Sequence, residues 1–300
     1  MIGRKARDDY SSVLGYHLSW LYLLLLVVML LSPVFYVMYI SFNEFGFGAR
    51  RYVFTLDWYR VIFSDKLMLG ALGWTMKLAV CTTVLVIPMA LLTAKLYKST
   101  TQKVPIVFLM LAPLFVASDI LGSALLVFFK NLNKSFESLS DWMGNEWFYG
   151  WFELGFLTAL IGLIIYTIPY AFIVILITMG RYREQQTEAA RACGASAWRA
   201  FWDVEFPQIR AGVFSACAFT MILCFNEYTR TSLLKGGFDT FTTVLVSQML
   251  NEGMSEQSYA MSSFVSFVAI AVIGSIILYT LRQSERLSRE ARQKAEPVAS

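Results

Sequence analysis

Residues 181–207 have the sequence RYREQQTEAARACGASAWRAFWDVEFP and lie between two long apolar segments, 154–180 and 207–228. The part from Glu184 to Cys193 consists largely of strong helix formers. Gly194 follows it, and glycine is common just beyond a helix because it tolerates a positive φ. This pattern predicts a polar helix that ends near Gly194 and is inserted between two apolar helices.

A second short helix is expected after Gly194, with apolar side chains at Trp198, Phe201 and Trp202. Pro207 then suits the first turn of the next apolar helix, where its missing N–H costs little. Two short amphipathic helices joined at a glycine form either a docking surface for another protein or an ordinary loop at a membrane interface. The residues alone leave both interpretations open.

The whole chain has the composition of a membrane protein. Hydrophobic residues make up 57% of its 300 residues and charged residues only 15%, and the mean hydropathy is +0.56. A soluble domain is typically about a quarter charged. Polar loops are expected at 42–66, 130–153 and 229–258. We expect an all-α membrane protein with six transmembrane helices, each long enough to cross a bilayer, at residues 18–40, 67–94, 104–129, 154–180, 207–228 and 259–281.

The distribution of basic residues predicts the orientation of these helices. With the N-terminus inside, the inner segments hold 16 Lys and Arg residues and the outer loops hold 8, while Lys77 lies within a span. This bias places both termini and the 181–207 insert in the cytoplasm. Residues 1–17 then form a cytoplasmic N-terminal segment, 18–281 the six-span domain and 282–300 a basic cytoplasmic tail. No interleaved basic and aromatic stretch indicates a nucleic-acid partner.

The insert carries a recognisable motif. Glu188-Ala189-Ala190 is followed after three residues by Gly194, and after nine more by Val204-Glu205-Phe206-Pro207. This resembles the EAA signature of binding-protein-dependent ABC importer permeases, in which Glu-Ala-Ala and Gly precede Ile-x-Leu-Pro at the same spacing. Here valine replaces the isoleucine and phenylalanine replaces the leucine, and both replacements stay apolar. The resemblance extends over most of the chain.

The resemblance implies the type I ABC importer transmembrane architecture (MetI-like) in a bacterial inner (cytoplasmic) membrane. It implies as partners two cytoplasmic ATP-binding subunits, a second permease that is similar or identical, and a periplasmic or lipid-anchored solute-binding protein. In the insert it implies a set of residues that couple to the ATPases. These are Glu188, Ala189, Ala190, Gly194, Ala195, Trp198, Phe201 and Pro207.

The sequence offers little for chemistry in this chain itself. It contains no GxxxxGK[ST] phosphate loop, so ATP and Mg are expected to bind to the partner ATPases, which would carry out hydrolysis. The one histidine, His17, leaves no His-based metal cluster and no Ser–His or Cys–His pair. The four cysteines show no CxxC spacing. We therefore expect no enzymatic activity, no cofactor and no metal site in this chain.

Polar residues within spans are costly and thus candidates for a solute path. Asp119, Asn226 and Glu227, with the adjacent Tyr228, are the path residues that we expect. The alternatives are that Asp119 caps a half-helix near Pro113 and that Glu227 reaches interfacial water. Lys77, early in the second span, is expected to extend its amine to the membrane surface.

The residues 225–253, FNEYTRTSLLKGGFDTFTTVLVSQMLNEG, are similar to the matching region of the spermidine/putrescine permeases. This implies a polyamine as the solute, since acidic and aromatic groups attract polycations. An opine, a phosphonate, an amino-acid derivative or ferric ion stays an alternative, because the cluster also occurs in their importers. A secondary transporter would show inverted repeats, and a membrane enzyme a catalytic constellation; neither is evident in the sequence.

Overall fold

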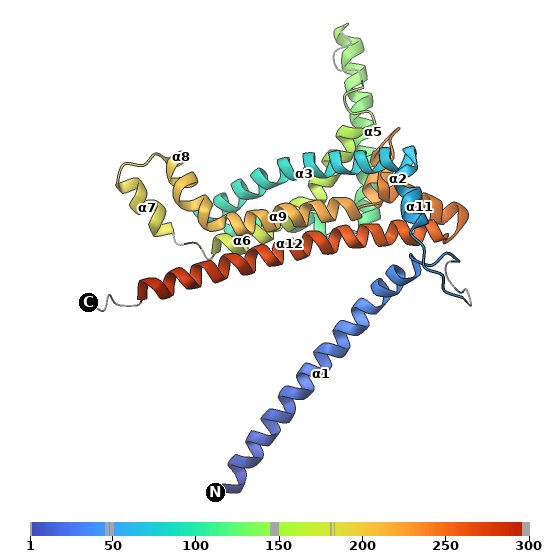
Figure 1. Cartoon of the computed structure of the whole chain (residues 1–300). Helices are drawn as coiled ribbons and strands as arrows, with labels where there is room; N and C mark the ends of the chain where they lie inside the picture. The colour runs from blue at the N-terminus through green and yellow to red at the C-terminus, as the bar shows by residue number, and fades with distance from the viewer. Residues whose placement is uncertain are drawn as a thin grey trace. The chain divides into compact units, whose positions relative to one another are not determined.

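The computed structural model describes residues 2–45, 48, 51–144, 150–180, 182 and 184–295, and within these it contains helices and no strand. Arg50, Trp147, Arg181 and Arg183 lie outside the described residues. In chain order the helices are α1 (Ile2–Ile40), α2 (Asp57–Ser64), α3 (Lys66–Ser99), α4 (Lys103–Leu111), the 3-10 helix η1 (Ala112–Phe115), α5 (Ser118–Met143), α6 (Phe156–Gly180), α7 (Glu184–Ala192), α8 (Ala197–Ala200), the π-helix η3 (Phe201–Glu205), α9 (Phe206–Asn226), α10 (Thr229–Leu234), α11 (Phe241–Glu252) and α12 (Glu256–Ala295) (Figure 1).

The chain forms two compact units, one of residues 1–64 and 248–267 and the other of residues 65–247 and 268–300. In the first unit, the Ser263 hydroxyl donates a hydrogen bond to the carbonyl of Val37 at 3.3 Å. The Phe63 and Phe264 rings meet edge to face, with centroids 5.5 Å apart. These contacts attach α1 and α2 to the first part of α12.

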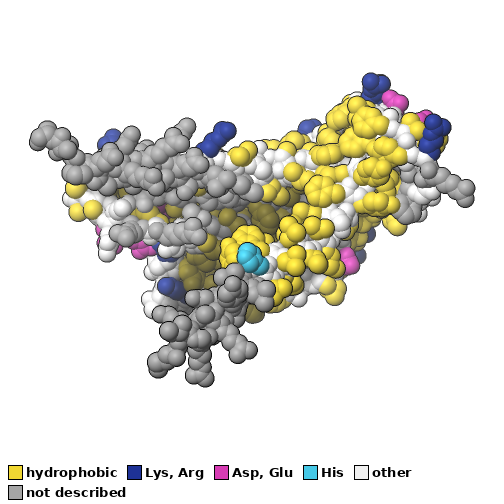
Figure 2. All heavy atoms as spheres, turned by 60° about the horizontal axis from the view of Figure 1, so that its bottom comes forward, with side chains coloured by type: hydrophobic (Ala, Val, Ile, Leu, Met, Phe, Trp, Pro, Cys, Tyr) yellow, Lys and Arg dark blue, Asp and Glu magenta, His cyan; other side chains and the backbone are white. Residues whose placement is uncertain are grey.

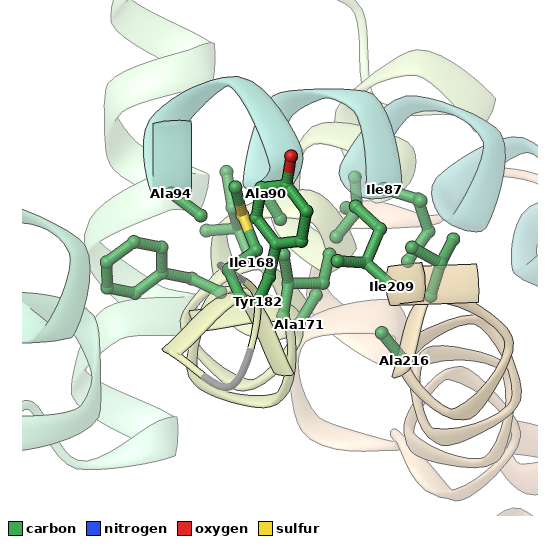
Figure 3. Close-up of a cluster of buried hydrophobic side chains, with 13 residues drawn as sticks. Ile87, Ala90, Ala94, Ile168, Ala171, Tyr182, Ile209 and Ala216 are labelled. Atoms are coloured by element: carbon green, nitrogen blue, oxygen red, sulfur yellow. The ribbon is translucent and has the colours of Figure 1, made fainter. Parts of the chain in front are cut away.

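In the second unit, α3, α6 and α9 run side by side, with α7 and α8 at one end and α5 at the other (Figure 1). Small residues at their contacts let the backbones approach closely. Ala90 of α3, Ala171 of α6 and Ala216 of α9 are completely buried in one apolar cluster, which Figure 3 shows together with Tyr182. A second cluster, around Phe129, buries the other end of the bundle.

Five helical segments are long and apolar enough to cross a membrane, and a bent pair of segments could provide a sixth, counted over the described residues. The five are Gly15–Ile40, Lys66–Ser99, Phe156–Gly180, Ala197–Asn226 and Glu256–Ser275. Large hydrophobic side chains cover much of the surface in Figure 2, as a lipid-facing surface requires. The predicted all-α membrane fold is therefore confirmed.

The span predicted at 104–129 is not one continuous helix. The segments Lys103–Phe115 and Ser118–Met143 meet at 99°. Pro113 cannot donate a helical hydrogen bond, and the backbone is extended at Val116, so the helix stops there. The new helix, α5, continues to Gly144, whose φ of +64° suits a helix end.

Three regions predicted as loops contain helices. Residues 130–143 extend α5 because this helix is amphipathic and keeps an apolar face although its sequence here is polar. On this face Phe136 packs on Phe152, with ring centroids 5.1 Å apart. Residues 57–64 form α2, and the region 229–258 holds α10 and α11.

Candidate functional site

The insert begins with the predicted polar helix, α7, which ends as expected at Gly194. This glycine has a φ of +91°, and its N–H donates to the carbonyl of Arg191 at 3.0 Å. The N–H of Ala195 donates to the carbonyl of Ala190 at 3.1 Å. This pair of bonds closes the end of α7 in a Schellman motif and turns the chain sharply toward α8.

The sequence suggested a separate second short helix. In the structure this helix continues into the next span. Ser196 caps α8, since its hydroxyl accepts the N–H of Arg199 at 3.3 Å. One π-turn, Phe201–Glu205, then joins α8 to α9, and Pro207 lies in the first turn of α9 as predicted. The helical segment therefore extends without a break over the 30 residues Ala197–Asn226.

Most of the expected coupling residues lie on the surface of the insert. Trp198 is 70% exposed, and its ring meets that of Trp202 edge to face with centroids 5.5 Å apart. Phe201 is partly buried against the core shown in Figure 3. Glu188, Ala189, Gly194 and Pro207 are exposed, and Ala190 and Ala195 are half-buried. The structure thus brings these residues onto one short element that a partner can reach.

A groove of about 510 Å³ separates α7 from the end of α3. Glu188 and Arg191 both line it, so they share a face of α7. Tyr182 lines the groove as well, and burial raises the pKa of its hydroxyl, with a further increase from the carboxylates of Glu205 and Glu184. The phenol is therefore neutral at physiological pH.

At the opposite end of α9 lies a buried ion pair. The Glu227 carboxylate is 3.0 Å from Nη1 of Arg230, and both side chains are less than a tenth exposed. The guanidinium carbon of Arg230 also lies 4.4 Å from the centroid of the Tyr166 ring. Glu227 is therefore buried and not open to water, because its charge is paired inside the bundle. Its expected part in a solute path stays a prediction.

Sequence reasoning missed Arg230 as a site residue and assigned it to an outer loop. The signal was present, since an acid and a base three residues apart in one helical turn can pair. Arg230 belongs to α10, which packs between α5 and α6. The fit is close: a Cβ on Gly162 of α6 would lie 2.6 Å from Cδ1 of Leu234.

The other expected path residues remain accessible. Asp119 is exposed in the first turn of α5, directly after the broken span, where the helix dipole favours a carboxylate. Asn226 is exposed at the end of α9, and its amide donates to the carbonyl of Ile222 at 3.1 Å. Tyr228 is half-buried. Lys77 is exposed on α3, with its amine 4.5 Å from the Trp74 ring centroid.

Within the described part of the chain, no three His, Cys, Asp or Glu side chains lie close enough to hold a metal ion. The second unit has an exposed polar insert at one end and a polar cluster at the other, joined by a continuous helix. Such an arrangement can transmit a movement between two ends of a membrane protein.

The chain resembles known proteins both in sequence and in fold. A family model described as "Binding-protein-dependent transport system inner membrane component" matches residues 86–284. The putrescine transport system permease protein PotI of Escherichia coli (strain K12) is 22% identical over 277 residues, which cover 88% of this chain and 90% of that protein. A spermidine/putrescine transport system permease protein PotC homolog of Mycoplasma genitalium is 28% identical over 146 residues, 49% of this chain and half of the relative. Among solved structures, a bacterial ABC transporter involved in the import of the acidic polysaccharide alginate matches in fold with a TM-score of 0.64 and 16% identity, over 94% of this chain and 99% of that chain.

Proposed function

This chain belongs to the family of binding-protein-dependent transport system inner membrane components, and from that premise we propose that it forms part of the path by which an ATP-driven importer takes up a polyamine. The predicted class, a membrane-spanning permease subunit of an ABC importer, is confirmed by the family match and by the fold shared with ABC transporters. The solute, the individual partners and the orientation are the further parts of the proposal.

The observation that carries the polyamine proposal is the similarity to PotI along nearly the whole chain. Chemistry of the second unit supports it. Asp119 offers an exposed carboxylate and Asn226 an exposed amide near the end of the bundle that holds α10, and both groups bind ammonium groups well. Tyr228 adds a half-buried aromatic ring, which can contribute a cation–π contact.

We propose that two cytoplasmic ATPase subunits drive the transport, one docked on the insert of this chain and one on that of a second permease. The exposed Glu188 and Trp198 and the rigid turn at Gly194 support this role for the insert. The sequence has no phosphate-binding loop, so ATP and Mg would be held by the ATPases. A solute-binding protein would deliver the polyamine to the outer loops. The excess of basic residues in the inner segments supports a cytoplasmic location for both termini.

The continuous helix suggests how docking reaches the path. Thirty residues from Ala197 to Asn226 span about 45 Å at 1.5 Å per residue. A tilt of the insert on closure of the ATPase pair would therefore move the outer end of α9, where Asn226 and the Glu227–Arg230 pair lie. The permease would alternate between inward-open and outward-open states in this way, and ATP hydrolysis would reset it.

The proposal is tested by purifying the complex and measuring ATP hydrolysis with the solute-binding protein and a panel of solutes. We expect an ATPase to co-purify in a similar amount and putrescine or spermidine to stimulate hydrolysis. Stimulation only by ferric ion, a phosphonate, an opine or an amino-acid derivative would contradict the polyamine proposal. Absence of any associated ATPase would contradict the proposed coupling through the insert.

A further inference from the structure

Two lysines at the end of α3 hold the two ends of the insert. Lys95 Nζ lies 2.9 Å from Oε2 of Glu205, the last residue of the π-turn, and 4.1 Å from the Phe201 ring centroid. Lys98 Nζ lies 2.8 Å from Oε1 of Glu184, the first residue of α7. The lysines are three residues apart and so project from the same face of α3. Together they connect α3 to the start and to the end of the insert.

The two ion pairs differ in exposure. The Glu205 side chain is only 7% exposed, so its carboxylate depends on Lys95 for a counter-charge. The Glu184 side chain is 57% exposed, so water can replace Lys98 at little cost. A movement of the insert can therefore open the Lys98–Glu184 pair, whereas Glu205 and Lys95 have to move together.

The π-turn places Glu205 between the insert and α9, so a movement of the insert would displace this residue. In this turn the N–H of Phe206 donates to the carbonyl of Phe201, five residues earlier, which widens the helix between the insert and α9. π-turns inside α-helices are frequently found at functional sites. Glu205 thus lies at the boundary between the docking element and the membrane-spanning part of the chain.

α3 connects this boundary to the far end of the unit. Its 34 residues contain Pro88, about two turns from Lys95, where a missing hydrogen bond lets the helix bend. Near its other end, the Thr75 hydroxyl accepts the backbone N–H of Phe241 at 2.8 Å, and both residues are buried. Movement of Lys95 would therefore reach Phe241, the first residue of α11, through α3. A movement of α9 would not reach it by this hydrogen bond.

We propose that Lys95 and Glu205 are positioning residues that carry movement of the insert into α3, so that two helices, α9 and α3, relay it to the outer end. This inference rests on the proposed coupling of the insert to ATPases. Glu205 occupies the variable position x of the Ile-x-Leu-Pro part of the motif, and Lys95 lies outside the motif.

The test uses the full complex with its ATPase subunits, and follows hydrogen exchange of residues 89–99 with and without a non-hydrolysable ATP analogue. We compare the single variants Lys95→Glu and Glu205→Lys with the double variant that carries both substitutions (the double exchange of charges). Lys103→Glu is the control, because the Lys103 amine lies 5.6 Å from the Tyr97 ring and contacts no carboxylate among the described residues. Putrescine uptake per ATP hydrolysed is measured in parallel.

In the wild type we expect the nucleotide analogue to change the rate of hydrogen exchange both in the insert and in residues 89–99. Each single variant should lose the change in 89–99 but keep it in the insert, with uptake per ATP reduced about fivefold or more. The double exchange should recover both. If a single variant fails to assemble, recovery in the double exchange still supports the pairing, and failure of the double exchange contradicts it.

A change in the insert without one in residues 89–99 of the wild type would overturn the inference and leave the proposed function standing. Single variants that keep the wild-type response in 89–99 would overturn it as well. Conversely, a nucleotide response in both segments without putrescine uptake would support the relay and contradict only the polyamine as solute.

Discussion

Glu227 and Arg230 are joined by two hydrogen bonds, since one oxygen of the carboxylate accepts from the backbone N–H of Arg230 at 2.9 Å and from its Nη1 at 3.0 Å. The carbonyl of Glu227 also accepts from the Thr242 hydroxyl at 3.1 Å. The pair therefore fixes the end of α9 to α10 and to the start of α11. A carboxylate held in this way stabilises the fold at this end of the bundle.

We accordingly predict that Glu227→Gln lowers the stability of the permease and not only its uptake. The glutamine oxygen can still accept the backbone N–H, but Arg230 would keep a buried charge without a partner, and breaking such a pair typically costs about 3–5 kcal/mol. Thermal unfolding of the purified complex measures this effect. Asn226→Ala, at an exposed neighbour, is the control and should unfold at the wild-type temperature. A normal unfolding temperature for Glu227→Gln would show that the ion pair is dispensable.

Asp119→Asn should weaken uptake but change the unfolding temperature only a little, because the exposed carboxylate contributes to stability only through the dipole of α5. Asp119 is exposed and has no ion-pair partner among the described residues, so removing its charge leaves no buried group unpaired. The expected result is a rise in the KM for putrescine of about five- to tenfold, as for the loss of one exposed charge contact worth about 1 kcal/mol. Asp141→Asn, on the exposed polar part of the same helix, should leave the KM unchanged. Equal effects of the two variants would argue against a path role for Asp119.

Gly236→Ala should be strongly destabilising, whereas Gly237→Ala should be nearly neutral. Gly236 has a φ of +65°, and a Cβ there would overlap the carbonyl oxygen of Leu154. A Cβ on Gly237 would meet no atom within 4 Å in the part of the chain that the structure describes. Strain of this kind costs about 1–3 kcal/mol before the overlap is counted. Unfolding temperatures of the two variants, measured side by side, test the close contact between this turn and the start of α6.

Gly194→Ala should reduce solute-stimulated ATP hydrolysis through backbone strain. A Cβ at position 194 would meet no atom of the described residues within 4 Å, so a steric clash within this chain is not the cause. The φ of +91° remains unfavourable for alanine by about 1–2 kcal/mol. Asparagine tolerates the left-handed region better, so Gly194→Asn should retain more activity than Gly194→Ala. Equal activity of both variants would mean that the turn does not matter for coupling.

Much of this architecture could be predicted from the sequence, because long apolar segments and turn residues act locally. The spans near α3, α6 and α9, the helix end at Gly194 and the position of Pro207 all follow from composition and from residues a few positions apart. The break before α5 was less evident. Pro113 lies in an apolar run that resembles a continuous span, and proline is tolerated within transmembrane helices.

The pairings that matter most for function could not be predicted in this way. Lys95 and Glu205 are far apart in the sequence, and nothing in either segment specifies the other. Thr75 and Phe241 are likewise brought together only by packing of the helices. Asp119 and Glu227 were both expected to line a path because both are acidic groups in apolar segments. Only the structure distinguishes the exposed carboxylate of Asp119 from the buried, paired carboxylate of Glu227.

We propose above that this permease moves a polyamine at the expense of ATP that is bound on the side of the insert. The most direct test is uptake of labelled putrescine into proteoliposomes that contain the complete complex, with the solute-binding protein outside and ATP either enclosed or added outside. We predict uptake when the ATP is on the side of the insert and none when it is only on the opposite side. Uptake that does not depend on ATP, or hydrolysis without putrescine uptake under any of these conditions, would contradict the claim.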